Sequence, residues 1–200
     1  MRGLTGRIAI IGWGSLIWDL DDLASKVEGD WLMGAGPVMP FEFSRVSPKR
    51  KRALAVCIDP AEGDPCPTSA ILSARDDIHM AAEDLRARER APRTELIGLC
   101  CARTGTVRSR ISALIPVMEA WCTATGAAGA VWTDLNDNYA TVLGRRFSIS
   151  DAIAYLKALP EESREEAVRY ITFAPQTTDT KLRRALTEEA WWQAEVARFT

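Results

Sequence analysis

The sequence predicts an α+β protein, with strands in the first hundred residues and helices in the second hundred. Short runs rich in Ile, Val and Phe, separated by Gly and Pro, fill the first half and are typical of strands. Apolar residues at helical spacing, preceded by capping residues or Pro, fill the second half. The chain has 200 residues, 47% of them hydrophobic and 26% charged, so it can bury a core without disulfides.

Six strands are expected, at residues 8–11, 38–47, 52–58, 68–73, 95–102 and 130–133. Residues 8–11 form a continuous apolar run, which is typical of a strand buried on both faces. Residues 38–47 and 52–58 flank the polar turn at 48–51 and therefore predict a hairpin.

Helices are expected at residues 77–90, 107–125, from 148 onward, 160–175 and 180–198. Asp76 or Asp77 can cap the first of these helices, and Pro92 follows its end. Pro116 is expected to kink the second helix. Pro160 opens the fourth helix and Pro175 closes it.

Composition excludes several classes of protein and partner. The net charge of −2 predicts no nucleic-acid partner, and the basic residues 49–52 are expected to be a solvated hairpin turn. Five cysteines without a CxxC pair, together with one histidine, predict neither a disulfide framework nor a metal site, and they suit a cytoplasmic location. The apolar run at residues 8–18 is too short to span a membrane.

A glycine-rich turn follows the first expected strand, with the sequence Gly12-Trp13-Gly14-Ser15. Consecutive exposed amides in such a turn can form a concave site for a carboxylate or phosphate. The alternative is a tight turn that only lets the chain leave the strand. Ile17 stands where a dinucleotide fingerprint needs glycine, so that motif is excluded.

Glu89 shares a helical stripe with apolar residues. Ile78, Ala82, Leu85 and Glu89 lie at spacings that place them on one side of a helix, whereas Glu83 and Asp84 are expected to point elsewhere. A carboxylate that faces a core or cavity has its charged form disfavoured and can exchange protons. The alternative is an ion pair between Glu89 and a nearby arginine, Arg86 or Arg93.

These two features together resemble the gamma-glutamylcyclotransferase superfamily, most closely its ChaC-like branch. The N-terminal strand and turn, IIGWGSLIWD, resemble the string FGYGSLIW that is common in that branch. The segment LRARE at residues 85–89, followed by another strand, resembles the Leu…Arg-Glu element of the family. The chain departs from the family at Trp13, where tyrosine is usual, and across residues 38–47, where an arginine-rich strand is usual.

The resemblance implies a single domain over residues 1–200, with a small mixed β-barrel at about 7–103 and a mainly helical extension at about 104–200. It implies that Glu89 is the catalytic residue and that Gly12, Trp13, Gly14, Ser15 and Leu16 grip the substrate. The implied reaction is cofactor-free and needs no metal. In it the α-amine of a γ-glutamyl amide or peptide attacks its own γ-carbonyl, which gives 5-oxoproline and a free amine.

Glu42 and Arg45 are further candidates for substrate binding. They lie in an otherwise apolar expected strand, where alternation places Glu42 on the face of Val46 and Arg45 on the face of Phe43. The alternative is a pair of charges on an edge strand. An alternative function for the whole chain is a non-catalytic, small-molecule-binding or regulatory module on the same fold.

Overall fold

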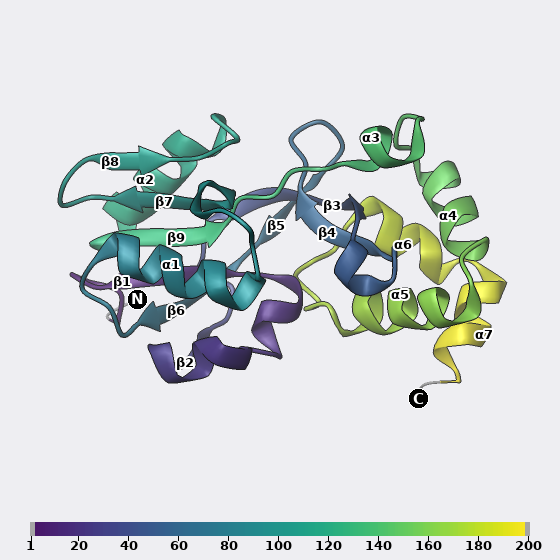
Figure 1. Cartoon of the computed structure of the whole chain (residues 1–200), viewed down its shortest axis with the longest axis horizontal. Coiled ribbons are helices and arrows are strands. Elements are labelled where there is room, and N and C mark those ends of the chain that lie inside the picture. Colours follow the sequence, from purple (N-terminus) through teal and green to yellow (C-terminus); the bar gives the residue numbers. More distant parts are fainter. Residues whose placement is uncertain (1–2, 199–200) are drawn as a thin grey trace. The chain divides into compact units, whose positions relative to one another are not determined.

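The computed structural model describes residues 3–198, shown in Figure 1, and the chain divides into two compact units. Unit 1 contains residues 1–39 and 67–135, and unit 2 contains residues 40–66 and 136–200. This division differs from the expected boundary near residue 104, because the hairpin after residue 40 belongs with the C-terminal helices. The ends of the expected domain, residues 1–2 and 199–200, lie outside the described residues.

Unit 1 is built on a six-stranded sheet. From edge to edge its strands are β2 (Val27–Leu32), β6 (Ser69–Ser73), β1 (Ile8–Gly12), β9 (Gly129–Thr133), β7 (Ile97–Cys101) and β8 (Thr106–Arg108). The first strand, β1, is fully buried between β6 and β9, as its apolar run predicts. The sheet ends at β2 and β8 and is not closed into a barrel, so the expected small barrel is not confirmed.

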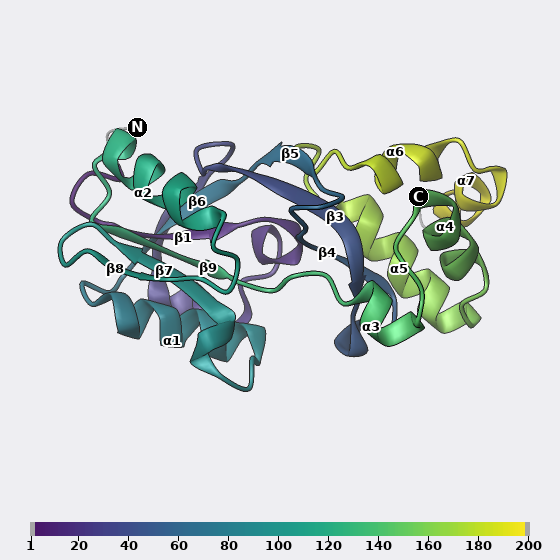
Figure 2. The ribbon, with the colours of Figure 1, turned by 90° about the horizontal axis from the view of Figure 1, so that it is seen from above.

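Two helices cover opposite faces of this sheet (Figure 2). Helix α1 (Ile78–Glu89) begins where the Asp77 side chain accepts hydrogen bonds from the amides of His79 and Met80. On the α1 side, alternate sheet residues and the helix form one apolar cluster that includes Ile8, Ile10 and Leu85. Helix α2 (Leu114–Thr125) contacts β7 and β9.

Helix α1 runs in the same direction as β1. A Cβ built at Gly129, which pairs with Ile8 at the start of β1, would lie 3.0 Å from the Cδ1 atom of Ile78 at the start of the helix. A helix of 12 residues is about 18 Å long, which exceeds the length of a five-residue strand. The end of α1 therefore lies at the end of β1 where the glycine turn begins.

The second expected helix is shorter than its sequence pattern suggests. Residues 106–108 form strand β8, and α2 begins only at Leu114. Pro116 therefore lies in the first helical turn, where its missing N–H would have no acceptor within the helix. The expectation that Pro116 kinks this helix is wrong for that reason.

Unit 2 contains a three-stranded sheet and a group of helices. In the sheet, β3 (Val38–Val46), whose first two residues belong to unit 1, lies between β4 (Leu54–Ile58) and β5 (Asp64–Pro67). The helices are α3 (Tyr139–Leu143), α4 (Ile149–Lys157), α5 (Glu161–Phe173), α6 (Lys181–Thr187) and α7 (Ala190–Val196). The hairpin of β3 and β4 is confirmed. The expected last helix is divided between α6 and α7 by a break at residues 188–189.

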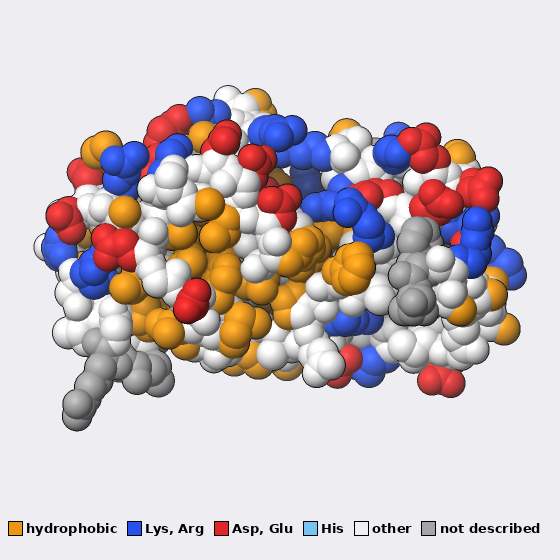
Figure 3. All heavy atoms as spheres, turned by 90° about the horizontal axis from the view of Figure 1, so that it is seen from below, with side chains coloured by type: hydrophobic (Ala, Val, Ile, Leu, Met, Phe, Trp, Pro, Cys, Tyr) orange, Lys and Arg blue, Asp and Glu red, His pale blue; other side chains and the backbone are white. Residues whose placement is uncertain are grey.

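Unit 1 has an apolar surface region beside its edge strand β2. Hydrophobic side chains gather on one face of the molecule in Figure 3. At the end of β2, Leu32 and the following Met33 are exposed by 37% and 56%. Among residues 3–198, no helix combines the length and the apolar character needed to cross a membrane.

Candidate functional site

The site in unit 1 begins where β1 ends. Gly12 is buried, and the indole of Trp31 lies directly against it. A Cβ at position 12 would meet the Trp31 Cη2 atom at 2.2 Å, so only glycine fits beneath this ring. Ile8, Ile10 and Gly12 lie on the same face of β1, because side chains alternate along a strand. This is the face that α1 covers, and Trp31 packs against the same apolar cluster.

The turn itself is a short 3-10 helix, Gly14–Ile17. Trp13 before it is extended, and Gly14 has a φ of 56°, a left-handed conformation that favours glycine. The first amides of such a turn have no acceptor within the helix, so those of Gly14 and Ser15 are the groups that can face a ligand. The Leu16 side chain is buried in the apolar cluster and offers a ligand only its backbone.

Glu89 is the last residue of α1, and 19% of its side chain is exposed. Its Oε1 atom lies 2.7 Å from the Nη1 atom of Arg88. The Nη2 atom of the same arginine donates to the carbonyl of Asp19, whose amide donates to the Ser15 carbonyl at 2.9 Å. A continuous chain of polar contacts therefore joins the Glu89 carboxylate to the glycine turn.

The other two acids of α1 behave differently from each other. Glu83 is exposed by 52% and pairs with Arg86. Glu89 does pair with an arginine, as the alternative to a cavity-facing carboxylate expects, but the partner is Arg88 and not Arg86. Asp84 was expected to point away from the core, but it is buried and pairs with Lys26 and Arg75. The buried face of α1 is therefore wider than the stripe of Ile78, Ala82 and Leu85 suggests, because the 3-10 segment Asp21–Lys26 also packs against the helix.

Two buried donors at this end of the sheet have no hydrogen-bond partner among the described residues. They are the Nε atom of Arg88, whose side chain is 8% exposed, and the Nε1 atom of Trp31. Neither residue is among those expected from the sequence to bind substrate or to act in catalysis. Arg88 lies within the Leu…Arg-Glu element, which is the one signal that could have identified it, whereas Trp31 approaches Gly12 only through the fold.

Glu42 does not face an open cavity, because it is fully buried inside unit 2. Its Oε1 accepts from the Phe43 amide at 2.8 Å, its Oε2 accepts from the Leu182 amide at 3.2 Å, and the Thr180 hydroxyl bonds it as well. Burial, only partly offset by these bonds, raises the pKa of Glu42 above its usual 4.5. Glu42 thus holds the beginning of α6 in place.

Arg45 also serves the packing of unit 2. Its Nη1 atom donates to the carbonyl of Asn136 at 2.7 Å. The strand alternation that was expected between Glu42 and Arg45 is interrupted, because three steps along β3 match two along β4 in a β-bulge. Strand β3 is also the central strand of its sheet, so these charges do not lie on an edge.

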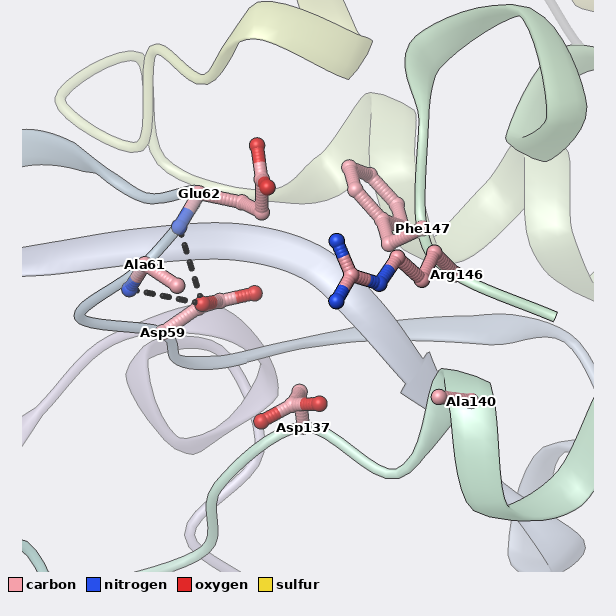
Figure 4. A pocket seen from close by; sticks show the side chains of 7 residues that line it. All are labelled: Asp59, Ala61, Glu62, Asp137, Ala140, Arg146 and Phe147. Atoms are coloured by element: carbon pink, nitrogen blue, oxygen red, sulfur yellow. Dashed lines mark hydrogen bonds between the residues drawn. The ribbon is translucent and has the colours of Figure 1, made fainter.

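Unit 2 contains a cavity of about 280 Å³ that no feature of the sequence predicts. It is lined by Asp59, Ala61, Glu62, Asp137, Ala140, Arg146 and Phe147. In Figure 4 the guanidinium of Arg146 points toward the acidic side chains. Asp59 is buried and accepts from the amides of Ala61 and Glu62 and from the Ser44 hydroxyl. Burial, followed by the charge of Asp59, raises the pKa of Asp137.

The residues expected to bind substrate are distributed over both units. Residues 12–16 and Glu89 belong to unit 1, whereas Glu42 and Arg45 belong to unit 2. Across residues 3–198, no group of three or more His, Cys, Asp or Glu side chains is arranged to hold a metal ion. Compared with protein-family models, with curated proteins and with solved structures, the chain matches none.

Proposed function

We propose that the chain is a cofactor-free enzyme of the gamma-glutamylcyclotransferase type, in which unit 1 is an open variant of that family's fold. Its substrate is a γ-glutamyl amide or peptide, and its products are 5-oxoproline and an amine. The proposed compartment is the cytoplasm, because five buried cysteines without disulfides suit a reducing environment.

The observation that carries this proposal is the contact chain from Glu89 through Arg88 and Asp19 to Ser15. It joins a partly buried carboxylate to the 3-10 turn at the end of a buried strand, whose first amides have no acceptor within the turn. A proton-exchanging group and a set of fixed dipoles are the two parts that an acyl transfer needs.

In the proposed reaction, Glu89 takes a proton from the α-ammonium group of the substrate. The freed amine attacks the γ-carbonyl carbon and closes a five-membered lactam ring. Glu89 then returns the proton to the nitrogen of the leaving amine as its bond to the γ-carbon breaks. The ring nitrogen loses its second proton to the released amine, which leaves as an ammonium ion. The nucleophile and the electrophile belong to one molecule, so the site mainly has to hold the folded conformer of the substrate. The amides of Gly14 and Ser15 stabilise the developing oxyanion.

The test is the release of 5-oxoproline from a panel of γ-glutamyl peptides and amines, measured by mass spectrometry. The change Glu89→Gln keeps the size of the side chain but removes proton exchange, so turnover should fall about 10²–10⁴-fold. The matched control is Glu83→Gln on the same helix, which should leave turnover unchanged because Glu83 is exposed and pairs with Arg86.

Equal turnover in the wild type and in Glu89→Gln would contradict the role of Glu89. Failure of the folded protein to release 5-oxoproline from any member of the panel would contradict the enzymatic function itself.

The cavity in unit 2 favours a second function, a small-molecule-binding module without catalysis. Its acidic side chains and Arg146 suit a ligand that carries both an ammonium group and a carboxylate. In this case free amino acids should raise the melting temperature of the protein. The change Arg146→Ala should abolish that effect, whereas Arg145→Ala should preserve it because Arg145 pairs with Asp151.

A further inference from the structure

The two unpartnered donors of unit 1, Arg88 Nε and Trp31 Nε1, lie on one face and at one end of the sheet. Trp31 packs against the apolar cluster that α1 covers, and its ring lies over Gly12 at the end of β1. Arg88 is in the last turn of α1, and its guanidinium bonds Asp19 just after the glycine turn. Arg88 therefore lies between Glu89 and the residues after the glycine turn, and Trp31 lies against Gly12 at the beginning of that turn.

A buried donor without a partner is costly, typically by about 1–3 kcal/mol and by more when the group is charged. Two such donors at one place are therefore unusual in a native protein and need an acceptor. The other nitrogens of Arg88 bond Glu89 and Asp19, which fixes the direction of its Nε–H. The ring of Trp31 is likewise fixed by its contact with Gly12.

We infer that Arg88 and Trp31 form a subsite for the carboxylate of the ligand. A planar carboxylate has two oxygens, so one can accept from the guanidinium Nε–H and the other from the indole Nε1–H. This inference deepens the proposed function and rests on it for the ligand, because a γ-glutamyl compound carries an α-carboxylate next to the reacting amine. The subsite makes the chain specific for compounds whose α-carboxylate is free.

The experiment titrates the ¹⁵N-labelled chain with 5-oxoproline and with 2-pyrrolidinone, which has the same ring without the carboxylate. The chain has seven tryptophans, and the loss of one indole signal in Trp31→Phe identifies the resonance of Trp31. We expect 5-oxoproline to shift this resonance and 2-pyrrolidinone to leave it in place. The indole signal of Trp121 is the internal control, because its Nε1 donates to the Ala35 carbonyl at 2.9 Å.

Two variants test the donors separately. Trp31→Phe keeps a ring over Gly12 but removes the indole N–H, and we expect it to weaken 5-oxoproline binding about tenfold. Arg88→Lys keeps the positive charge but removes the Nε–H, and a loss of at least the same size is expected. Trp121→Phe loses a hydrogen bond inside unit 1 and should bind 5-oxoproline as the wild type does.

Equal shifts from both ligands would overturn the inference. Unchanged binding in Trp31→Phe would also overturn it. A Trp31 resonance that 5-oxoproline does not move would do the same, because the indole N–H would then bond water and not the ligand. If 5-oxoproline moves Trp31 but no γ-glutamyl compound is cyclised, the subsite stands and the proposed reaction fails. If cyclisation depends on Glu89 but Trp31 does not respond, the reaction stands and the subsite fails.

Discussion

Unit 1 and unit 2 each contain a buried carboxylate that their helices depend on, Asp84 in α1 and Glu42 opposite the start of α6. Burial disfavours the charge of Asp84, but hydrogen bonds from Arg75 and Lys26 outweigh it and lower its pKa below 3.8. Glu42 receives only neutral donors, and burial raises its pKa above 4.5. The comparison shows that cationic partners, rather than depth alone, decide which form of a buried acid is stable.

The largest effect on stability is expected for Asp84→Asn. The change leaves Lys26 and Arg75 without their common partner, and unit 1 should lose about 2 kcal/mol of unfolding free energy at neutral pH. Because the pKa of Asp84 is lowered in the folded state, its stabilisation is present above pH 3.8 and disappears as the pH falls through the lower folded value.

Chemical denaturation of Asp84→Asn and of the wild type at a series of pH values measures this effect. The difference in unfolding free energy between the two proteins should shrink in acid. A difference that stays constant down to the lowest pH would contradict the role of Lys26 and Arg75 in keeping Asp84 charged. Glu83→Gln is the matched control, since the carboxylate of Glu83 is exposed and pairs with Arg86 and Thr94.

An intermediate effect is expected for Thr180→Val. The Thr180 hydroxyl caps α6 by accepting from the Arg183 amide, and it also bonds Glu42. Its removal should cost unit 2 about 1–2 kcal/mol. Thr180→Ser keeps both hydrogen bonds and should retain most of the stability. Hydrogen exchange at the amides of α6 measures this loss of stability. If these amides are as protected in Thr180→Val as in the wild type, the predicted role of the Thr180 hydroxyl is wrong.

The smallest effect at neutral pH is expected for Glu42→Gln. The change removes one amide acceptor, which costs less than about 1 kcal/mol because ionised Glu42 is itself disfavoured there. The raised pKa means that the stabilisation by Glu42 is present below pH 4.5 and disappears as the pH rises through the folded value.

The unfolding free energy of Glu42→Gln should therefore improve relative to the wild type as the pH rises. This trend is opposite in direction to that of Asp84→Asn, and denaturation of both variants across the same pH series would reveal it. If the unfolding free energy of the wild type instead rises relative to that of Glu42→Gln as the pH rises, the donors around Glu42 stabilise its charged form, as cations would.

Much of unit 1 could be predicted because its strands carry their own signals. The apolar run of β1 and the stripe of α1 located the central strand and the position of Glu89. Strand β2 was missed because its middle residues, Glu28 to Asp30, are polar and lie at a sheet edge, where exposure removes the apolar pattern.

Unit 2 was harder to predict. The role of Glu42 depends on a bulge in β3, which changes the alternation of faces without a mark in the sequence. Strand β5 is not among the expected strands, because its two prolines disfavour a strand in the sequence pattern. The two unpartnered donors of unit 1 were missed for a related reason. Arg88 and Trp31 are far apart in the chain, and only the sheet brings them to the same end.

The division of the chain has a consequence for the order in which it folds during synthesis. The chain passes from one unit to the other at residues 39–40, 66–67 and 135–136, so neither unit is one continuous segment. Strand β1 emerges from the ribosome before the other described strands, yet its parallel partner β9 follows only at Gly129–Thr133. Central pairing in unit 1 must therefore await most of the chain. The hairpin of β3 and β4, a local pair, can form long before the helices that cover it.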